Sequence, residues 1–241
     1  FDSYASSGSE KMTLDGAVNK TSIMLAVLIS TAALSWNFPS PLMSLISYVG
    51  IFAAGISSLI TFGFWVPFIG FIINPRPHLA PKTWLVFAAG EGFFIGLISL
   101  AFESMFPGIV LEAVSLTFCV AASLLFLYKS GLVKPSQNFV LMLCSAIFGI
   151  FLFYIGILIY TLVSGSSPEI FSGSSNASIG LSLFVVGIAA LSLVLDFDII
   201  EQSAERGAPK YMEYFGAMAL VTTLIWLYIE ILRLLAKFRS R

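Results

Sequence analysis

The sequence has little charge and few of the residue types that catalytic sites require. Only 10% of its 241 residues are charged, against about 25% in a soluble domain. It contains one histidine, His78, and two cysteines, Cys119 and Cys144, which do not form a metal-spaced pair. A histidine-based zinc site and a Ser-His-Asp triad are therefore strongly disfavoured. The sequence also lacks a glycine-rich phosphate loop, which argues against nucleotide chemistry.

Apolar residues dominate the composition instead. They make up 58% of the chain, and the mean hydropathy is +0.97. This composition is typical of an integral membrane protein, whose surroundings are the lipid bilayer. The net charge of −1 provides no basic field that would attract nucleic acid.

Long apolar runs predict seven membrane-spanning helices, since a spanning helix needs about 20 apolar residues. The first run could pass for a signal peptide, but six more follow it, so we expect a retained span. We therefore predict an all-α integral membrane fold, with a polar tail over 1–19 and a single seven-helix domain over 20–241. The polar stretch 164–176 is expected to be a flexible connector. The predicted spans are Lys20–Trp36, Leu42–Trp65, Pro81–Phe102, Met105–Tyr128, Asn138–Val163, Ala177–Ile200 and Pro209–Phe238.

Basic residues before the first span and in alternate loops predict the orientation. They are Lys11, Lys20, Arg76, Lys82, Lys129, Lys134, Arg206 and Lys210, and the other loops have none. By the positive-inside rule the N-terminus faces the cytoplasm, or the matrix of an organelle. We expect a bacterial inner membrane, with the inner membrane of an organelle as the alternative. The basic residues Arg233–Arg241 face the opposite side if the last helix crosses fully; a re-entrant or tilted helix is the alternative.

Acidic residues interrupt two of the apolar runs. Glu91 lies at the midpoint of its predicted span, and Asp196 directly follows an uncharged run. All Lys and Arg lie near predicted helix ends or in loops, so we expect charge at membrane depth to be acidic only. A buried carboxylate without a basic partner binds a proton or a cation, or faces water. Both residues are therefore candidates for a proton or ion site. For Glu91 the alternative is a protonated side chain that packs against another helix.

Two further acids are candidates with stronger structural alternatives. Asp198 shares a helix face with Glu201 near the end of its span, where solvation is an alternative role. Glu230 lies deep in the last apolar run, but Arg233 three residues later allows an i,i+3 ion pair. Near Glu91, Gly92 and Gly96 form a small-xxx-small face, for which helix packing is the simpler explanation.

Several motifs resemble the Bax inhibitor-1 (TMBIM) family. They are "LTFCVAASLLFLYKSG" (116–131), "DFDIIEQSAERGAPKY" (196–211) and "WLYIEILRLL" (226–235). Three others are similar to its bacterial Bax inhibitor-1/YccA-like subgroup: "MTLDGAVNKT" (12–21), "EGFFIG" (91–96) and "GAPKYMEYFGAMAL" (207–220). The resemblance covers about residues 12–238, and its specificity comes from the order of the motifs.

The resemblance implies a seven-helix, pH-sensitive calcium leak or Ca²⁺/H⁺ exchanger. It places two proton-sharing carboxylates on the last two spans, with Ca²⁺ as the transported ion and no resident cofactor. Asp196, or Asp198 in a second alignment, matches the first acid. Glu230 matches the second, so Asp196 and Glu230 are candidate Ca²⁺ ligands. These two lie 34 positions apart, more than in the family, which leaves Glu91 as another partner for Asp196.

A second function fits the same features. The chain would be a non-transporting regulator that binds a membrane protease or another membrane complex through its helices. An enzyme is the weakest alternative. The acids could form a hydrolase pair only with a route for substrate that the sequence does not show, and no cluster of metal ligands supports it.

Overall fold

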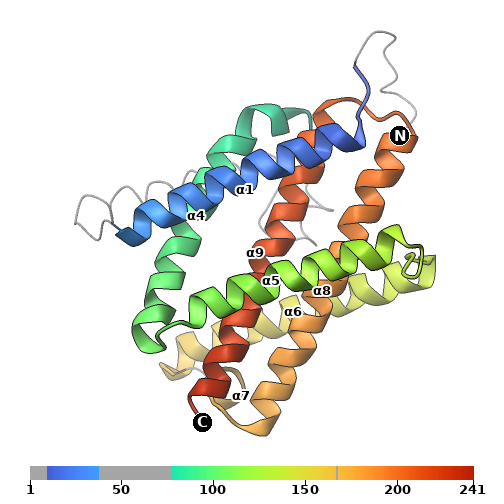
Figure 1. Ribbon diagram of the computed structural model, residues 1–241. Coiled ribbons are helices and arrows are strands. Elements are labelled where there is room, and N and C mark those ends of the chain that lie inside the picture. The colour runs from blue at the N-terminus through green and yellow to red at the C-terminus, as the bar shows by residue number, and fades with distance from the viewer. Residues whose placement is uncertain (1–9, 38–76, 167) are drawn as a thin grey trace. The chain divides into compact units, whose positions relative to one another are not determined.

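The computed structural model describes residues 10–37, 77–166 and 168–241 (Figure 1). Within these ranges, six helices are long and apolar enough to cross a membrane. Apart from one isolated bridge, all regular structure in the described residues is helical. The predicted all-α membrane fold is confirmed. The predicted span Leu42–Trp65 lies outside the described residues.

The helix bounds follow the predicted apolar runs closely. α1 is Leu14–Asn37, and the short helix η1 (Pro77–Leu79) leads into α4 (Ala80–Met105). The others are α5 (Ile109–Lys129), α6 (Gln137–Ser164), α7 (Glu169–Ser172), α8 (Asn176–Glu205) and α9 (Tyr211–Arg239). α1 begins inside the stretch that we assigned to the polar tail.

A tight turn corrects the predicted start of the fourth span. Met105 ends α4, and α5 begins only at Ile109. Gly108 adopts a left-handed backbone with φ 84°, a conformation that favours glycine. The Glu103 side chain accepts a hydrogen bond from the Gly108 N–H at 2.6 Å. The turn is therefore built from residues that the apolar pattern alone assigned to the helix.

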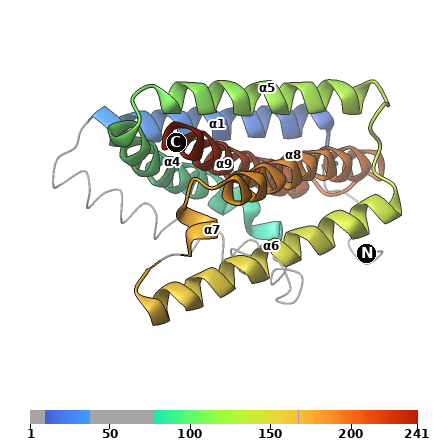
Figure 2. The same cartoon turned by 90° about the horizontal axis from the view of Figure 1, so that it is seen from below.

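The connector between α6 and α8 contains regular structure. α6 ends at Ser164, and Gly165 after it, with a φ of 71°, caps the helix. The four-residue helix α7 follows within the stretch that we predicted to be only flexible (Figure 2). The polar composition did not reveal this turn. Its Phe171 contacts a residue distant in sequence, with the ring centre 5.8 Å from that of Tyr154 on α6.

The chain divides into two compact units, each built from two separate stretches. The first unit comprises Phe1–Ala101 and Asp196–Thr222, and the second comprises Phe102–Leu195 and Thr223–Arg241. α8 and α9 thus contribute residues to both. This division places Glu91, Asp196 and Asp198 in the first unit and Glu230 in the second.

In the first unit, α4 packs closely on α1 through glycine. A Cβ atom on Gly92 would overlap the Thr31 hydroxyl and the Leu28 carbonyl of α1. A Cβ on Gly96 would overlap the Ser35 hydroxyl in the same way. The small-xxx-small face is therefore a helix-packing surface, as the simpler interpretation predicted.

We expect Gly92→Ala to destabilise the protein by about 1–3 kcal/mol, because the added methyl group overpacks a backbone contact. The measurement is the thermal unfolding midpoint in detergent. Gly187→Ala is the matched control, since the position is helical and a Cβ there meets nothing within 4 Å. Equal midpoints for the two variants would contradict the close approach of α1 and α4.

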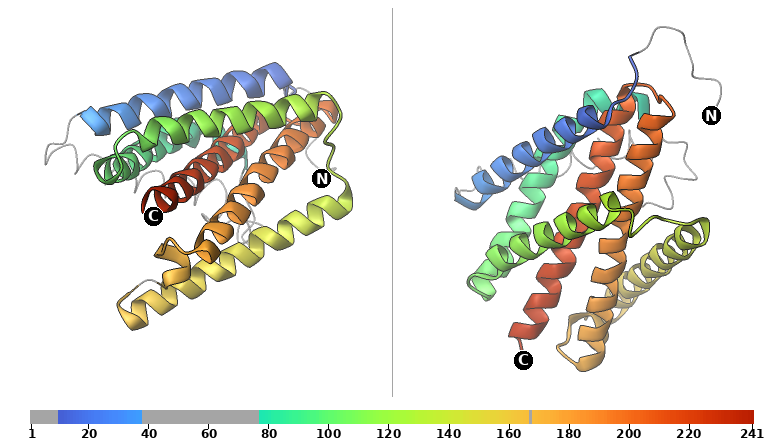
Figure 3. Two further views of the ribbon diagram at one scale, coloured as in Figure 1. Left: turned by 60° about the horizontal axis from the view of Figure 1, so that its bottom comes forward. Right: turned by 45° about the vertical axis from the view of Figure 1, so that its right-hand side comes forward.

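The segment before α1 pairs with the turn that joins α8 to α9 (Figure 3). The Met12 N–H donates to the Ala208 carbonyl at 2.7 Å, and the Lys210 N–H donates to the Glu10 carbonyl at 2.9 Å. Met12 is buried in a small apolar cluster with Ile200. These contacts fix the start of α1 on the α8–α9 turn.

A surface ion pair joins the same two segments. Lys210 lowers the pKa of Glu10 below its ordinary value, first through a hydrogen bond and then through its charge. The pair therefore stabilises the fold above the ordinary pKa of the glutamate, and this contribution is lost as the pH falls through the lowered pKa. Because both groups are exposed to water, the contribution is small.

Glu213 connects the first turns of two helices. It lies in the first turn of α9 and is buried. Its carboxylate accepts hydrogen bonds from the Thr13 N–H (3.0 Å) and hydroxyl (3.1 Å). The Thr13 hydroxyl in turn accepts from the Gly16 N–H of α1 at 3.0 Å. Thr13 therefore caps α1, and Glu213 holds the cap in place.

We expect Thr13→Val to lower stability by about 1 kcal/mol, the usual cost of losing an N-cap hydroxyl. Thr21→Val serves as the control, because the Thr21 hydroxyl donates only to the Ala17 carbonyl of its own helix. Thermal unfolding of both variants in detergent would measure the difference. An unfolding midpoint for Thr13→Val no lower than that of the control would argue against the cap.

Candidate functional site

Glu91 occupies the middle of α4 and is almost fully buried. Its residue exposure is 4%, within a helix of membrane-spanning length. Ala88 and Gly90 beside it are also buried, so the local sequence places a carboxyl group among small side chains. An ionisable group at this depth is costly to retain and is by default a candidate functional residue.

Asp196 lies on α8 in the same compact unit as Glu91. Leu193 and Val194, just before it, are fully buried, whereas Asp196 itself is half-buried. The uncharged run therefore places this carboxylate at the edge of the apolar packing rather than at a solvated helix end. Sequence reasoning favoured Asp196 for the same reason.

Asp198 is part of a polar ladder along α8. Its carboxylate accepts a hydrogen bond from the Gln202 side-chain amide at 2.6 Å, and Gln202 in turn accepts from Arg206 at 2.8 Å. The four-residue spacing puts these three side chains on one helix face. Asp198 therefore has local polar partners near the end of the helix.

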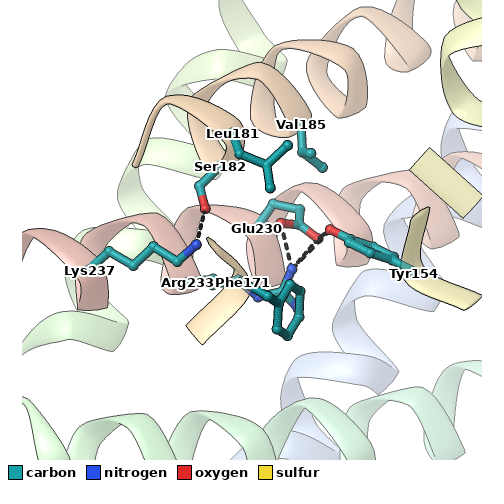
Figure 4. Close-up of a pocket in the computed structure, with 8 residues that line it drawn as sticks. All are labelled: Tyr154, Phe171, Leu181, Ser182, Val185, Glu230, Arg233 and Lys237. Carbon is teal, nitrogen blue, oxygen red and sulfur yellow. Dashed lines mark hydrogen bonds and ion pairs between the residues drawn. The ribbon is translucent and has the colours of Figure 1, made fainter. Parts of the chain in front are cut away.

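Glu230 forms a buried ion pair on α9, in the second unit. Arg233 donates to both of its carboxylate oxygens at 2.9 Å. The Tyr154 hydroxyl on α6 donates to Glu230 at 2.8 Å (Figure 4). The residue exposure of Glu230 is 2%. The i,i+3 pair that the spacing allowed is confirmed.

Two basic residues of α9 near Glu230 are also covered by neighbouring parts of the protein. The Arg233 side chain is only 25% exposed, and its guanidinium lies 4.6 Å from the centre of the Phe171 ring. Lys237, one turn further along α9, has a residue exposure of 5%. Sequence reasoning placed both at a helix end without foreseeing that neighbouring helices cover them.

The last turns of α9 contact the starts of α5 and α8. Arg239 donates to the Pro107 carbonyl and to Glu112, both at 2.6 Å. Arg241 forms a hydrogen bond with Asn176. α9 is an unbroken helix of 29 residues, which favours a full crossing over a re-entrant helix.

Among the described residues no closed metal site is formed. Ca²⁺ takes 6–8 oxygen ligands, and no group of three or more His, Cys, Asp or Glu side chains gathers among the described residues. The carboxylate of Glu230 already binds Arg233 and Tyr154. Asp196 and Glu91 lie in the same compact unit.

Three residues of these networks were missed from the sequence. Tyr154 lies 76 positions from Glu230 and sits in an apolar run without any local signal. Lys237 carried a signal, since Glu230, Arg233 and Lys237 follow an i, i+3, i+7 pattern that predicts one helix face. Glu213 also carried one, as an acid in the first turn of a helix, where negative charge is favourable.

The six helices of membrane-spanning length in the described residues define a multi-pass, all-α integral membrane protein. The sequence profile described as "Bax inhibitor 1 like" matches residues 1–240. The chain therefore belongs to the Bax inhibitor 1-like family of membrane proteins. A comparison with curated proteins found no matching sequence.

Proposed function

We propose that this protein is a pH-sensitive cation leak for Ca²⁺, or a Ca²⁺/H⁺ exchanger, controlled by Glu91 and Asp196. The observation that carries the proposal is the burial of the Glu91 carboxyl group in the middle of an apolar, membrane-spanning helix. An acidic side chain at this position costs free energy, which an apolar side chain packed in the same place would not. Proton or cation binding provides a reason for it.

The mechanism follows from the two charge states of such a site. At low pH the carboxyl groups are neutral, and they are compatible with close helix packing in a low-dielectric environment. At higher pH they lose protons, and two negative charges in one unit repel each other and attract cations. The leak therefore opens as the pH rises and closes as it falls.

We assign Glu91, rather than Glu230, as the partner of Asp196. Glu91 and Asp196 belong to one compact unit, whereas the charge of Glu230 is balanced by Arg233. The family resemblance matched Glu230 to the second proton-sharing acid because of its sequence context. Its spacing from Asp196 is larger than in the family, so the sequence left the partner of Asp196 open. We assign Glu230 a structural role.

The test of transport is Ca²⁺ flux into dye-loaded proteoliposomes over roughly pH 5–8, the range in which a buried carboxyl group would titrate. We expect the flux to rise with pH and to exceed that of empty liposomes. Folded protein that gives no flux at any pH would refute the leak. It would favour a regulator that binds a membrane protease or another membrane complex.

A further inference from the structure

Lys237 is a buried cation whose partners are neutral. Its ammonium group donates to the Ser182 hydroxyl at 2.8 Å (Figure 4). It also donates to the Ser178 carbonyl at 3.2 Å. Both partners lie on α8, in the same compact unit. An ammonium group has three donors, so the described residues leave one of them for another ligand.

The charges around Lys237 do not balance within the described residues. The small cavity beside it is lined by one carboxylate, Glu230, and by two cations, Arg233 and Lys237. Arg233 contacts both oxygens of Glu230, which leaves the charge of Lys237 uncompensated. The first turns of α8 add the positive end of a helix dipole. A buried cation without a counter-ion is costly, so this site favours an anion.

The size of the cavity limits what can enter. Its volume is about 10 Å³, which is roughly the space that one water molecule needs. The Ser178 hydroxyl is also fully buried and has no hydrogen-bond partner in the described part of the chain. A whole free metabolite does not fit, whereas one oxygen of an anion held outside the cavity does.

The position of the site points to the source of that anion. Lys237 lies two residues before the end of α9 at Arg239, where a spanning helix meets the lipid headgroups. Arg241 at the same end adds positive charge near the surface, whereas the charge of Arg239 is balanced by Glu112. Basic clusters of this kind attract anionic lipids.

We propose that Lys237 and Ser182 bind a phosphate oxygen of an anionic membrane lipid. The lipid phosphate supplies the counter-charge for Lys237, and its acyl chains stay in the bilayer beside the protein. This binding site is independent of the proposed ion leak, because it lies in the second unit and uses neither Glu91 nor Asp196.

The test compares lipids in delipidated, detergent-solubilised protein. Phosphatidylglycerol, phosphatidylcholine with the same acyl chains, and inorganic phosphate alone are added separately, and thermal unfolding is followed by tryptophan fluorescence. In the native protein we expect phosphatidylglycerol to raise the unfolding midpoint by about 5 °C more than phosphatidylcholine does. Native mass spectrometry should detect retained phosphatidylglycerol.

Variants separate the site from general lipid effects. Lys237→Met should abolish the preference for phosphatidylglycerol, and Lys237→Arg should retain most of it. Lys134→Met, at an exposed lysine of the same unit, should keep the full preference. Equal shifts with both lipids in the native protein, or an unchanged preference in Lys237→Met, would overturn the proposal. An equal rise of the unfolding midpoint with inorganic phosphate alone would show that the anion does not come from a lipid.

Discussion

Asp196→Asn is expected to remove the pH response of Ca²⁺ flux. The asparagine side chain keeps the size of the native one but neither loses a proton nor attracts a cation, so one of the two titrating groups is lost. In the native protein we expect flux at pH 8 to exceed flux at pH 6 by about tenfold, as for a group that titrates within that range. In Asp196→Asn this ratio should approach one, with the flux held near its low-pH level.

The matched control for this variant is Asp15→Asn. Asp15 is an exposed acid in the first turn of α1, so its substitution removes the same charge from the same unit without touching the membrane-depth site. Its flux ratio should equal that of the native protein. If Asp15→Asn and Asp196→Asn lowered the ratio equally, the effect would come from surface charge, and the role assigned to Asp196 would be wrong.

Glu230→Gln is expected to act on stability rather than on the pH response. Removing one partner of a buried ion pair costs about 3–5 kcal/mol, because it leaves the other charge uncompensated. Here Arg233 would lose its counter-ion close to a second cation, the buried Lys237. Thermal unfolding in detergent should show a midpoint lower by roughly 6–20 °C. Flux per folded protein should keep its native ratio between pH 8 and pH 6.

Glu112→Gln is the matched control for the ion pair. Glu112 also pairs with an arginine of α9, Arg239, but its side chain is 52% exposed. Exposed pairs contribute about 0–1 kcal/mol, so this variant should unfold close to the native midpoint. A lost pH response in folded Glu230→Gln would return Glu230 to the ion site, as the family resemblance implied.

The sequence predicted the helices well because membrane spans need only length and apolarity. Six of the predicted spans correspond to α1, α4, α5, α6, α8 and α9. The remaining predicted span, Leu42–Trp65, lies outside the described residues. Errors occurred where a local turn overrides the apolar pattern. Gly108 separates α4 from α5 within an apolar stretch, and α7 forms inside a polar connector.

The side-chain networks were predictable only where they are local in sequence. The pair of Glu230 with Arg233 is three residues apart, and its spacing predicted it. The bond from Tyr154 to Glu230 and the contact of Lys237 with Ser182 join different helices. Helix periodicity predicts which face a residue occupies but not which helix covers that face. For the same reason the sequence predicted that Gly92 packs closely, but not that its partner is α1.

Glu91→Gln tests most directly whether Glu91 carries the pH response together with Asp196. The measurement is the ratio of Ca²⁺ flux at pH 8 to that at pH 6 in proteoliposomes, normalised to folded protein. We predict a ratio near one for Glu91→Gln and no further change when Asp196→Asn is added, because the two acids act as one site. A native ratio in Glu91→Gln would contradict the account and leave the buried glutamate as a packing residue of α4.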